Sequence, residues 1–112
     1  MTQQELYTLL KAIGYPVAFF AFDSPPALPY LVYLDTTSDD FMADNRNHVD
    51  VTNWQVELYT AIGMQTGERL AAEHKVQDAL NAGGLPYVRS RQRIDAEKMY
   101  QTLYTIQTIS GE

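Results

Sequence analysis

The chain has no cysteine among its 112 residues. This excludes a disulfide framework, a thiolate zinc site and a thiol nucleophile, and it fits a reducing compartment. Histidine is scarce as well. His74 falls in a charged stretch of a predicted helix, where a solvated side chain is expected, and His48 lies beside Asp50 in a polar loop. Nucleophilic catalysis by Ser or Thr usually needs an activating base with a group that orients it, so we expect no enzymatic activity.

Positively charged residues are few, and long apolar runs are absent. Eight Lys and Arg face fourteen Asp and Glu, which gives a net charge of −6. Binding to nucleic acid or anionic lipid depends on neutralising phosphates, so this balance opposes both. The longest apolar run, Val17–Phe22, is too short to span a bilayer, and the first residues carry no basic signal region. We therefore expect partners that are proteins, with no specific nucleic acid and no membrane.

Metal and nucleotide motifs are weak or missing. Asp35, Asp39, Asp40 and Asp44 lie within ten residues, but their spacing departs from the calcium loop of alternating acids with a central Gly and a terminal Glu. Asx turns in a solvated loop are the expected role of these carboxylates. The Gly83-Gly84 pair precedes no helix that could hold a phosphate. We predict no metal and no cofactor.

What the sequence does contain is enough apolar residue for one core. Hydrophobic residues make up 46% and charged residues 20%, close to the globular average. A chain of this length has room for one hydrophobic core, so we expect a single domain over residues 1–112.

The first half of the chain predicts one helix and three strands. A capping box at Thr2–Glu5 opens a helix whose apolar stripe is Leu6, Leu9, Leu10 and Ile13, with Gly14 placed to end it. Val17–Phe22 and Tyr30–Leu34 are β-prone runs, separated by a loop that holds three of the five prolines. A third strand is predicted over residues 51–60, where Trp54, Val56 and Leu58 alternate with polar residues.

The second half predicts a helix and two strands. The helix opens at Thr66 and ends at the Gly83-Gly84 pair, with Val76 and Leu80 turned inward. Leu85–Ile94 and Met99–Ile109 follow as strands, and the last one has apolar residues on both sides, which favours a central position or a partner chain. The order α-β-β-β-α-β-β predicts an α+β fold with a mixed, mainly antiparallel sheet of four to five strands against two helices.

Two features are candidate protein interfaces. Arg89, Arg91 and Arg93 recur at a spacing of two, which on a strand forms one basic stripe. The stripe is either a solvated face whose ion pairs contribute little or a patch for an acidic neighbour. The acidic loop with Asp39, Asp40 and Asp44 is its possible complement, as a ring interface joins two different patches.

Phe41 and Met42 are two large apolar residues in this polar loop. Either the loop folds back and buries them in its own domain, or an assembly partner covers them and removes their apolar surface from water. We place Phe41 and Met42 among the candidate interface residues.

Several short strings, in order along nearly the whole chain, resemble small proteins of phages and prophages of Gram-positive bacteria. These strings are Gly14–Ala18, Pro25–Tyr30, Phe41–Asn45, Val56–Thr60 and Glu97–Gln101. The similar proteins belong to the tail terminator family, within the head-to-tail joining and tail-completion proteins. The strings are structural, and the family has no active site to carry over.

The resemblance implies a fold of a sheet with two helices and a structural role in the virion. A tail terminator forms a ring, often of six subunits, on the end of the tail tube, stops its growth and presents a surface to the head connector. The implied partners are other copies of the chain, the tail tube protein and a head-completion protein, with assembly in the cytoplasm of the bacterial host. Another neck component, such as a head-closure or adaptor protein, and a small ligand-binding or regulatory module remain the alternatives.

Overall fold

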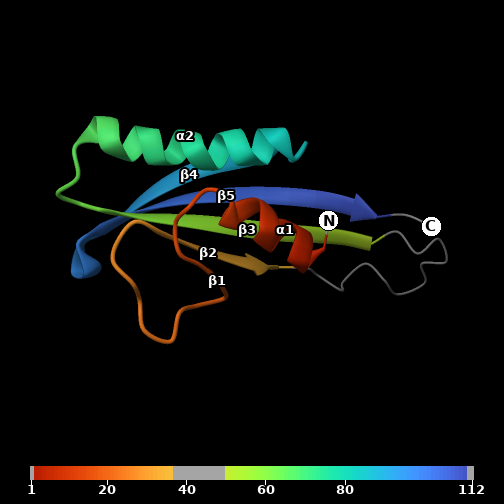
Figure 1. Cartoon of the computed structure of the whole chain (residues 1–112), viewed down its shortest axis with the longest axis horizontal. Helices are drawn as coiled ribbons and strands as arrows, with labels where there is room; N and C mark the ends of the chain where they lie inside the picture. The colour runs from red at the N-terminus through yellow and green to blue at the C-terminus, as the bar shows by residue number, and fades with distance from the viewer. Residues whose placement is uncertain (1, 37–49, 111–112) are drawn as a thin grey trace.

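The chain forms one five-stranded sheet with two helices, as seen in a computed structural model that describes residues 2–36 and 50–110 (Figure 1). The strands lie in the order β1-β2-β3-β5-β4. Only β1 and β2 are parallel, and the other three pairings are antiparallel. The predicted α+β class, its mixed sheet and the element order are confirmed. The sheet therefore has two edge strands, β1 and β4, which are of very different length.

Helix α1 (Gln3–Lys11) begins as the sequence predicts. The Thr2 hydroxyl accepts the Glu5 backbone N–H at 3.1 Å, and the Glu5 carboxylate accepts the Thr2 N–H at 2.7 Å. This reciprocal pair satisfies two donors that a helix start leaves free. Helical geometry ends at Ala12, and Gly14 then takes a φ of 105°, a left-handed conformation in which glycine carries no steric cost. The helix is thus slightly shorter than its apolar stripe.

Helix α2 (Thr66–Ala82) runs along one face of the sheet (Figure 1). It starts at the predicted residue and is followed by the Gly83-Gly84 pair. Gly83 also marks the contact with α1, since a Cβ added there would come within 2.5 Å of Leu9 Cδ1. A side chain at this position would push Leu9 aside, so the glycine lets the end of α2 approach α1 closely.

Strand β1 (Val17–Phe19) is much shorter than the predicted Val17–Phe22, and that prediction is wrong at its end. The Ala21 N–H donates to the Phe19 carbonyl at 2.8 Å, while Phe20 between them has a φ of 70°. This is a γ-turn of the strained kind, and a bulky residue rarely adopts it. The turn takes the chain out of the sheet despite the β propensity of the next residues.

The ten residues from Phe20 to Pro29 then pass beneath the sheet, on the side away from α2 (Figure 1), before strand β2 (Tyr30–Asp35) begins. We call this segment the β1–β2 loop. The ring of Phe22 packs edge-on against that of Tyr30 at 5.3 Å between centroids. Tyr30 and Val32 face away from the helices and are nonetheless buried, since this loop covers them.

Strands β3 (Asp50–Ala61) and β5 (Met99–Ser110) form the centre of the sheet and pair along their whole length. Strand β4 (Tyr87–Ile94) follows Pro86 and pairs only with β5. A short 3-10 helix, η2 (Asp95–Glu97), joins β4 to β5. Strand β5 lies between β3 and β4, which is the central position, the first of the two settings predicted for the last strand.

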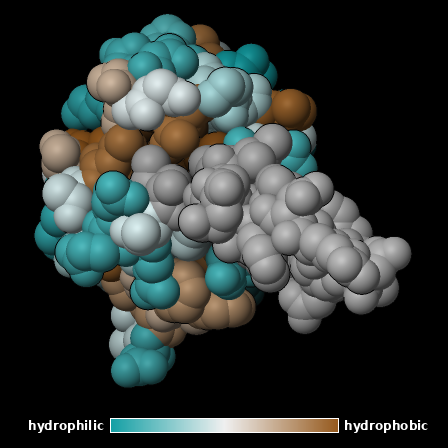
Figure 2. Space-filling view, turned by 90° about the vertical axis from the view of Figure 1, so that its right-hand side faces the viewer, coloured by the Kyte–Doolittle hydropathy of each residue, from teal (hydrophilic) through white to brown (hydrophobic). Residues whose placement is uncertain are grey.

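The core lies between the sheet and the helices. Register places alternate residues of each strand on this side, including Leu31, Val56, Leu58 and Tyr104. The buried apolar residues of this core are Leu6, Leu10, Leu31, Tyr33, Trp54, Val56, Leu58, Ala72, Val76, Leu80, Leu85, Tyr104 and Ile106. Of the residues expected to be inward, Leu9 and Ile13 are only half-buried at the rim. Seen from one end, hydrophobic side chains show between hydrophilic surfaces above and below (Figure 2).

Candidate functional site

The arginine stripe lies on β4, an edge strand of the sheet. The pairing of Arg89 with Tyr104 and of Arg91 with Thr102 puts the stripe on the same side as the core residues of β5. The three arginines therefore lie on the side that α2 covers, and α2 provides partners for two of them. Sequence spacing predicts the common face correctly but says nothing about these partners.

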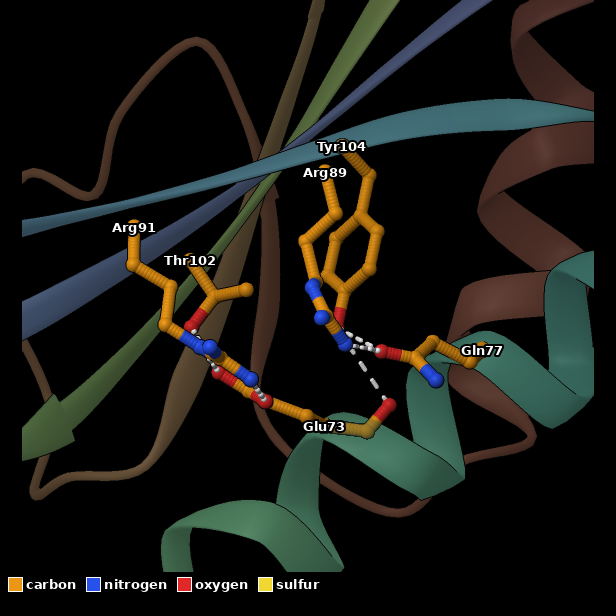
Figure 3. A network of polar contacts seen from close by, with 6 residues as sticks. All are labelled: Glu73, Gln77, Arg89, Arg91, Thr102 and Tyr104. Carbon is orange, nitrogen blue, oxygen red and sulfur yellow. Dashed lines mark hydrogen bonds and ion pairs between the residues drawn. The ribbon is translucent and has the colours of Figure 1, made fainter.

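Arg91 forms an ion pair with Glu73 of α2 (Figure 3). Its Nε donates to Oε2 at 2.8 Å and its Nη2 to Oε1 at 2.7 Å, which is the two-pronged geometry that matches a guanidinium to a carboxylate. The Thr102 hydroxyl donates to the same Oε2 at 2.7 Å. The Glu73 side chain has no solvent exposure, whereas that of Arg91 is 38% exposed. The buried carboxylate thus receives three hydrogen bonds.

These contacts determine the direction in which the pKa of Glu73 is shifted. Burial alone raises the pKa of a carboxyl group, but the hydrogen bonds from Arg91 and Thr102 and the charge of Arg91 outweigh it, so the pKa of Glu73 is below its ordinary value of 4.5. The same hydrogen bonds to Glu73 raise the pKa of Arg91. The pair is fully charged at neutral pH.

A second set of contacts continues the network toward the end of α2 (Figure 3). Arg89 Nη1 donates to Gln77 Oε1 at 2.8 Å. The Tyr104 hydroxyl lies 3.2 Å from the same oxygen and 3.3 Å from the Glu73 carbonyl oxygen. Burial, followed by the charge of Glu73, raises the pKa of Tyr104 well above its ordinary value of 10.0, so its hydroxyl stays protonated. The network joins α2 to β4 and β5 through charged and polar groups.

Arg93 differs from the other two arginines. Its Nε pairs with Asp95 of η2, and the side chains of both residues are exposed, at 61% and 77%. An exposed pair of this kind contributes little to stability because solvent screens it. Arg93 is therefore more exposed than Arg91, and its partner is exposed as well.

Sequence reasoning missed Glu73, Gln77, Thr102 and Tyr104 as members of a polar network. Glu73 stands in a charged stretch with His74 and Lys75, for which solvation is the obvious expectation, and His74 is indeed exposed. The available signal is positional. Glu73 and Gln77 are four residues apart and directly follow Ala72 and Val76, so they form a second row beside the apolar stripe of the helix.

This network of polar contacts attaches α2 to β4 and β5. The Glu73 carboxylate is buried and receives three hydrogen bonds from Arg91 and Thr102. Within residues 2–36 and 50–110, no group of three or more His, Asp or Glu side chains is placed to hold a metal ion, and no helix there is long and apolar enough to cross a membrane.

The acidic loop holds the other candidate interface residues. Asp39, Asp40, Phe41, Met42 and Asp44 lie outside the described residues, as does His48. Asp35, the first acid of the loop, is exposed at the end of β2. The predicted contact of this loop with a neighbouring subunit stays a prediction.

Comparison with known proteins finds a structural likeness. No family model matches the chain, and no curated protein matches it in sequence. The fold is similar to that of a chain in the solved structure described as "Virion of native gene transfer agent (GTA) particle", with a TM-score of 0.63. The two chains are 14% identical, and the match covers 96% of this chain and 92% of the other. At this identity the likeness establishes a shared fold.

Proposed function

We propose that the protein is a structural component of a phage or prophage virion, and specifically a tail terminator that forms a ring on the end of the tail tube and joins it to the head connector. The observation that carries the proposal is the likeness to a chain of a gene transfer agent virion, which extends over nearly all of both chains. The family resemblance of the sequence strings points the same way, through different evidence.

Features of the chain support a role in assembly without catalysis. In the described residues the charged groups of the α2–β4 network hold one another, and the acidic net charge opposes nucleic acid binding. A ring requires two different patches on each subunit that fit one another. The two edges of the sheet are our candidates for such a pair, since β1 and β4 differ in length and in the charge of their side chains. The proposed partners are other copies of the chain, the tail tube protein and a head-completion protein.

Electron microscopy of the purified protein tests the ring. We expect closed rings, often of six subunits, either in the free protein or when tail tubes are present. Light scattering on the same sample gives the subunit number. A protein that stays monomeric alone and with tubes would contradict the proposal.

A capping assay separates a terminator from another neck component. Tube protein of the same virus is polymerised with and without the chain, and tube lengths are measured. A terminator binds one end of the tube and stops its growth. A head-closure or adaptor protein leaves tube growth unchanged and binds the head connector instead.

A further inference from the structure

A depression of about 180 Å³ lies on the open face of the sheet, under the β1–β2 loop. Its aromatic walls are Phe20, Phe22, Tyr30 and Tyr59, and the carboxylate of Glu57 lies among them. Four rings around one acid form an unusual surface in a chain whose open face is otherwise mostly polar or aliphatic. We call it the aromatic pocket.

The walls of the aromatic pocket are held in place by contacts of their own. The rings of Tyr30 and Tyr59, on the paired strands β2 and β3, lie 5.1 Å apart, and Phe22 closes on Tyr30 from the loop. The Tyr59 hydroxyl donates to Glu57 at 2.7 Å and accepts from Gln101 at 2.9 Å. The pocket is therefore formed before any ligand enters, which reduces the entropy lost on binding.

The charge of the pocket is negative. Among the described residues Glu57 forms no ion pair, and its one hydrogen-bond donor is the neutral Tyr59. Burial, followed by the charges of Glu97 and Glu57, raises the pKa of Tyr30, so a second carboxylate contributes to the local potential. A cation over aromatic faces and beside a carboxylate gains from both. The chemistry fits the end of an arginine or lysine side chain.

The rim of the pocket carries a strained and exposed aromatic residue. Phe20 is 58% exposed and stands at the centre of the γ-turn with its φ of 70°. Backbone strain of this kind persists where the surrounding structure enforces it, and it gathers at functional positions. An exposed apolar ring at a strained residue is therefore a reason to look for a contact surface here.

We propose that the aromatic pocket receives the Arg93 side chain of a second copy of the chain, so that the β1 side of one subunit meets the β4 edge of the next. This inference rests on the proposed ring and identifies the two patches that form it. Arg93 reaches Glu57 and the aromatic faces of the neighbour and exchanges its exposed pair with Asp95 for this contact.

The choice of Arg93 follows from its surroundings. Arg91 is engaged with buried Glu73 and Arg89 with Gln77, whereas Arg93 has an exposed partner. The strand register also supports the choice of Arg93, because it puts this residue at the same end of the sheet as the pocket. It lies opposite Tyr100, which lies opposite Thr60, the residue after Tyr59. The pocket and Arg93 are therefore at the same end of the sheet and on its opposite faces, the pocket over β2 and β3 and Arg93 on the β4 edge.

Contact between opposite edges is heterologous, because each subunit offers a pocket to one neighbour and an arginine to the other. Repeated contacts of this type close into a ring or continue as a filament. Pairing of two copies through the same patch would instead stop at a dimer. The proposed pair of patches thus fits the ring and excludes a two-fold dimer as the working assembly.

Charge reversal tests the contact. Glu57→Arg and Arg93→Glu each place like charges together, so we expect each variant to self-associate at least about tenfold more weakly than the wild type in sedimentation experiments. The double variant in one chain restores opposite charges at every contact, and we expect it to form rings again. Lys11→Glu makes the same change of charge as Arg93→Glu at an exposed residue of α1, so it is the matched control for that variant and should assemble normally.

Cross-linking gives an independent readout, because the chain has no cysteine. Glu57→Cys and Arg93→Cys variants are mixed and treated with a short bismaleimide. We expect a cross-link between the two different variants and none within either variant alone. A cross-link in the Arg93→Cys variant alone would show a two-fold contact and overturn the proposal.

The outcomes separate the two proposals. Wild-type rings that cap tubes, together with unaltered rings of Glu57→Arg and Arg93→Glu, would overturn the pocket contact and leave the terminator function standing. Rings that persist in Glu57→Arg while tube capping is lost would assign the pocket to a basic side chain of the tube protein and also overturn it. A wild type without rings would contradict the proposed function itself. Circular dichroism of each variant verifies its fold.

Discussion

The two edges of the sheet differ in how they are held. Strand β4 has eight residues, and α2 is attached to it through Arg91 and Glu73. Strand β1 has three residues and ends in the strained turn at Phe20. A long edge with charged side chains resists unwanted pairing with other chains, and a very short edge offers little to pair with. Both edges are therefore protected from uncontrolled strand pairing, β4 by its charged side chains and β1 by its short length.

The difference indicates where specificity resides. At the β4 edge Arg91 forms a partly buried ion pair with Glu73, whereas Arg93 forms an exposed pair with Asp95 that another molecule can replace. At the β1 edge the apolar groups serve folding at Phe19 and are exposed at Phe20. At each edge, one residue stabilises the fold and a nearby residue of the same type is exposed to partners. Single substitutions can therefore test the two roles separately.

The largest effect is expected at the buried ion pair of the β4 edge. Arg91→Met leaves Glu73 buried without its cation, and loss of one partner of a buried pair costs about 3–5 kcal/mol of unfolding free energy. We expect a value at or below the lower end, because Arg91 is 38% exposed. Urea unfolding measures the change.

Arg93→Met is the matched control on the same strand, and its unfolding midpoint should be unaltered. The double variant Glu73→Leu/Arg91→Met removes both charges and should recover much of the lost stability. Equal midpoints for Arg91→Met and Arg93→Met would show that the two arginines do not differ as described.

Acid should act on the β4 edge in the same direction. The pKa of Glu73 is lowered in the folded chain, so its contribution is fully present above the ordinary value of 4.5 and is lost as the pH falls through the folded value. We expect stability to decrease steeply below about pH 4.5 and Glu73→Gln to show a shallower decrease. Urea unfolding midpoints across this pH range measure the difference. Parallel curves of midpoint against pH for the wild type and Glu73→Gln would contradict the prediction.

Loss of the Phe20 side chain at the β1 edge should change stability much less than loss of Arg91 at the β4 edge. Phe20→Gly removes an exposed ring and relieves a backbone strain that costs about 1–3 kcal/mol. The ring also packs against Phe19 at 4.7 Å between centroids, so we expect a melting temperature close to that of the wild type. Assembly should weaken, since the rim of the aromatic pocket is lost.

Phe19→Ala is the comparison for this variant. Phe19 packs against Tyr33 at the rim of the core, so its truncation should lower the melting temperature, by less than the roughly 3–5 kcal/mol of a fully buried Phe. Greater destabilisation by Phe20→Gly than by Phe19→Ala would place Phe20 with the structural residues.

The smallest effect is at high pH. Burial and the hydrogen bond to Glu57 raise the pKa of Tyr59 to about 12. A raised folded pKa gives stability that is present below the ordinary value of 10.0 and is lost as the pH rises through 12. Absorbance titration should show several late tyrosines, with Tyr59 and Tyr104 among them, and Tyr59→Phe should remove the one that titrates near pH 12. An unchanged titration curve in that variant would argue against the Glu57 contact.

Patterns of one element are readable from the sequence, and contacts between elements are not. Trp54, Val56 and Leu58 alternate on one strand, so their burial follows from period alone. The end of β1 depends on a γ-turn at Phe20, which local propensity opposes. Glu73 becomes buried because Arg91 and Thr102, on other elements, supply its donors. Spacing predicts the shared face of Arg89, Arg91 and Arg93, but not that their partners differ.

The central pairing of the sheet has a consequence for how fast the chain folds. Strands β3 and β5 pair along their full length, yet the whole of α2 and β4 lies between them in the sequence. Such pairing requires a long loop to close before the contacts compensate its entropy. We expect refolding in milliseconds to seconds, the range of proteins with distant pairings, and not in the microseconds of helical bundles. Until β5 docks, β3 has an unpaired edge, so newly made chains pass through a state that is prone to aggregation.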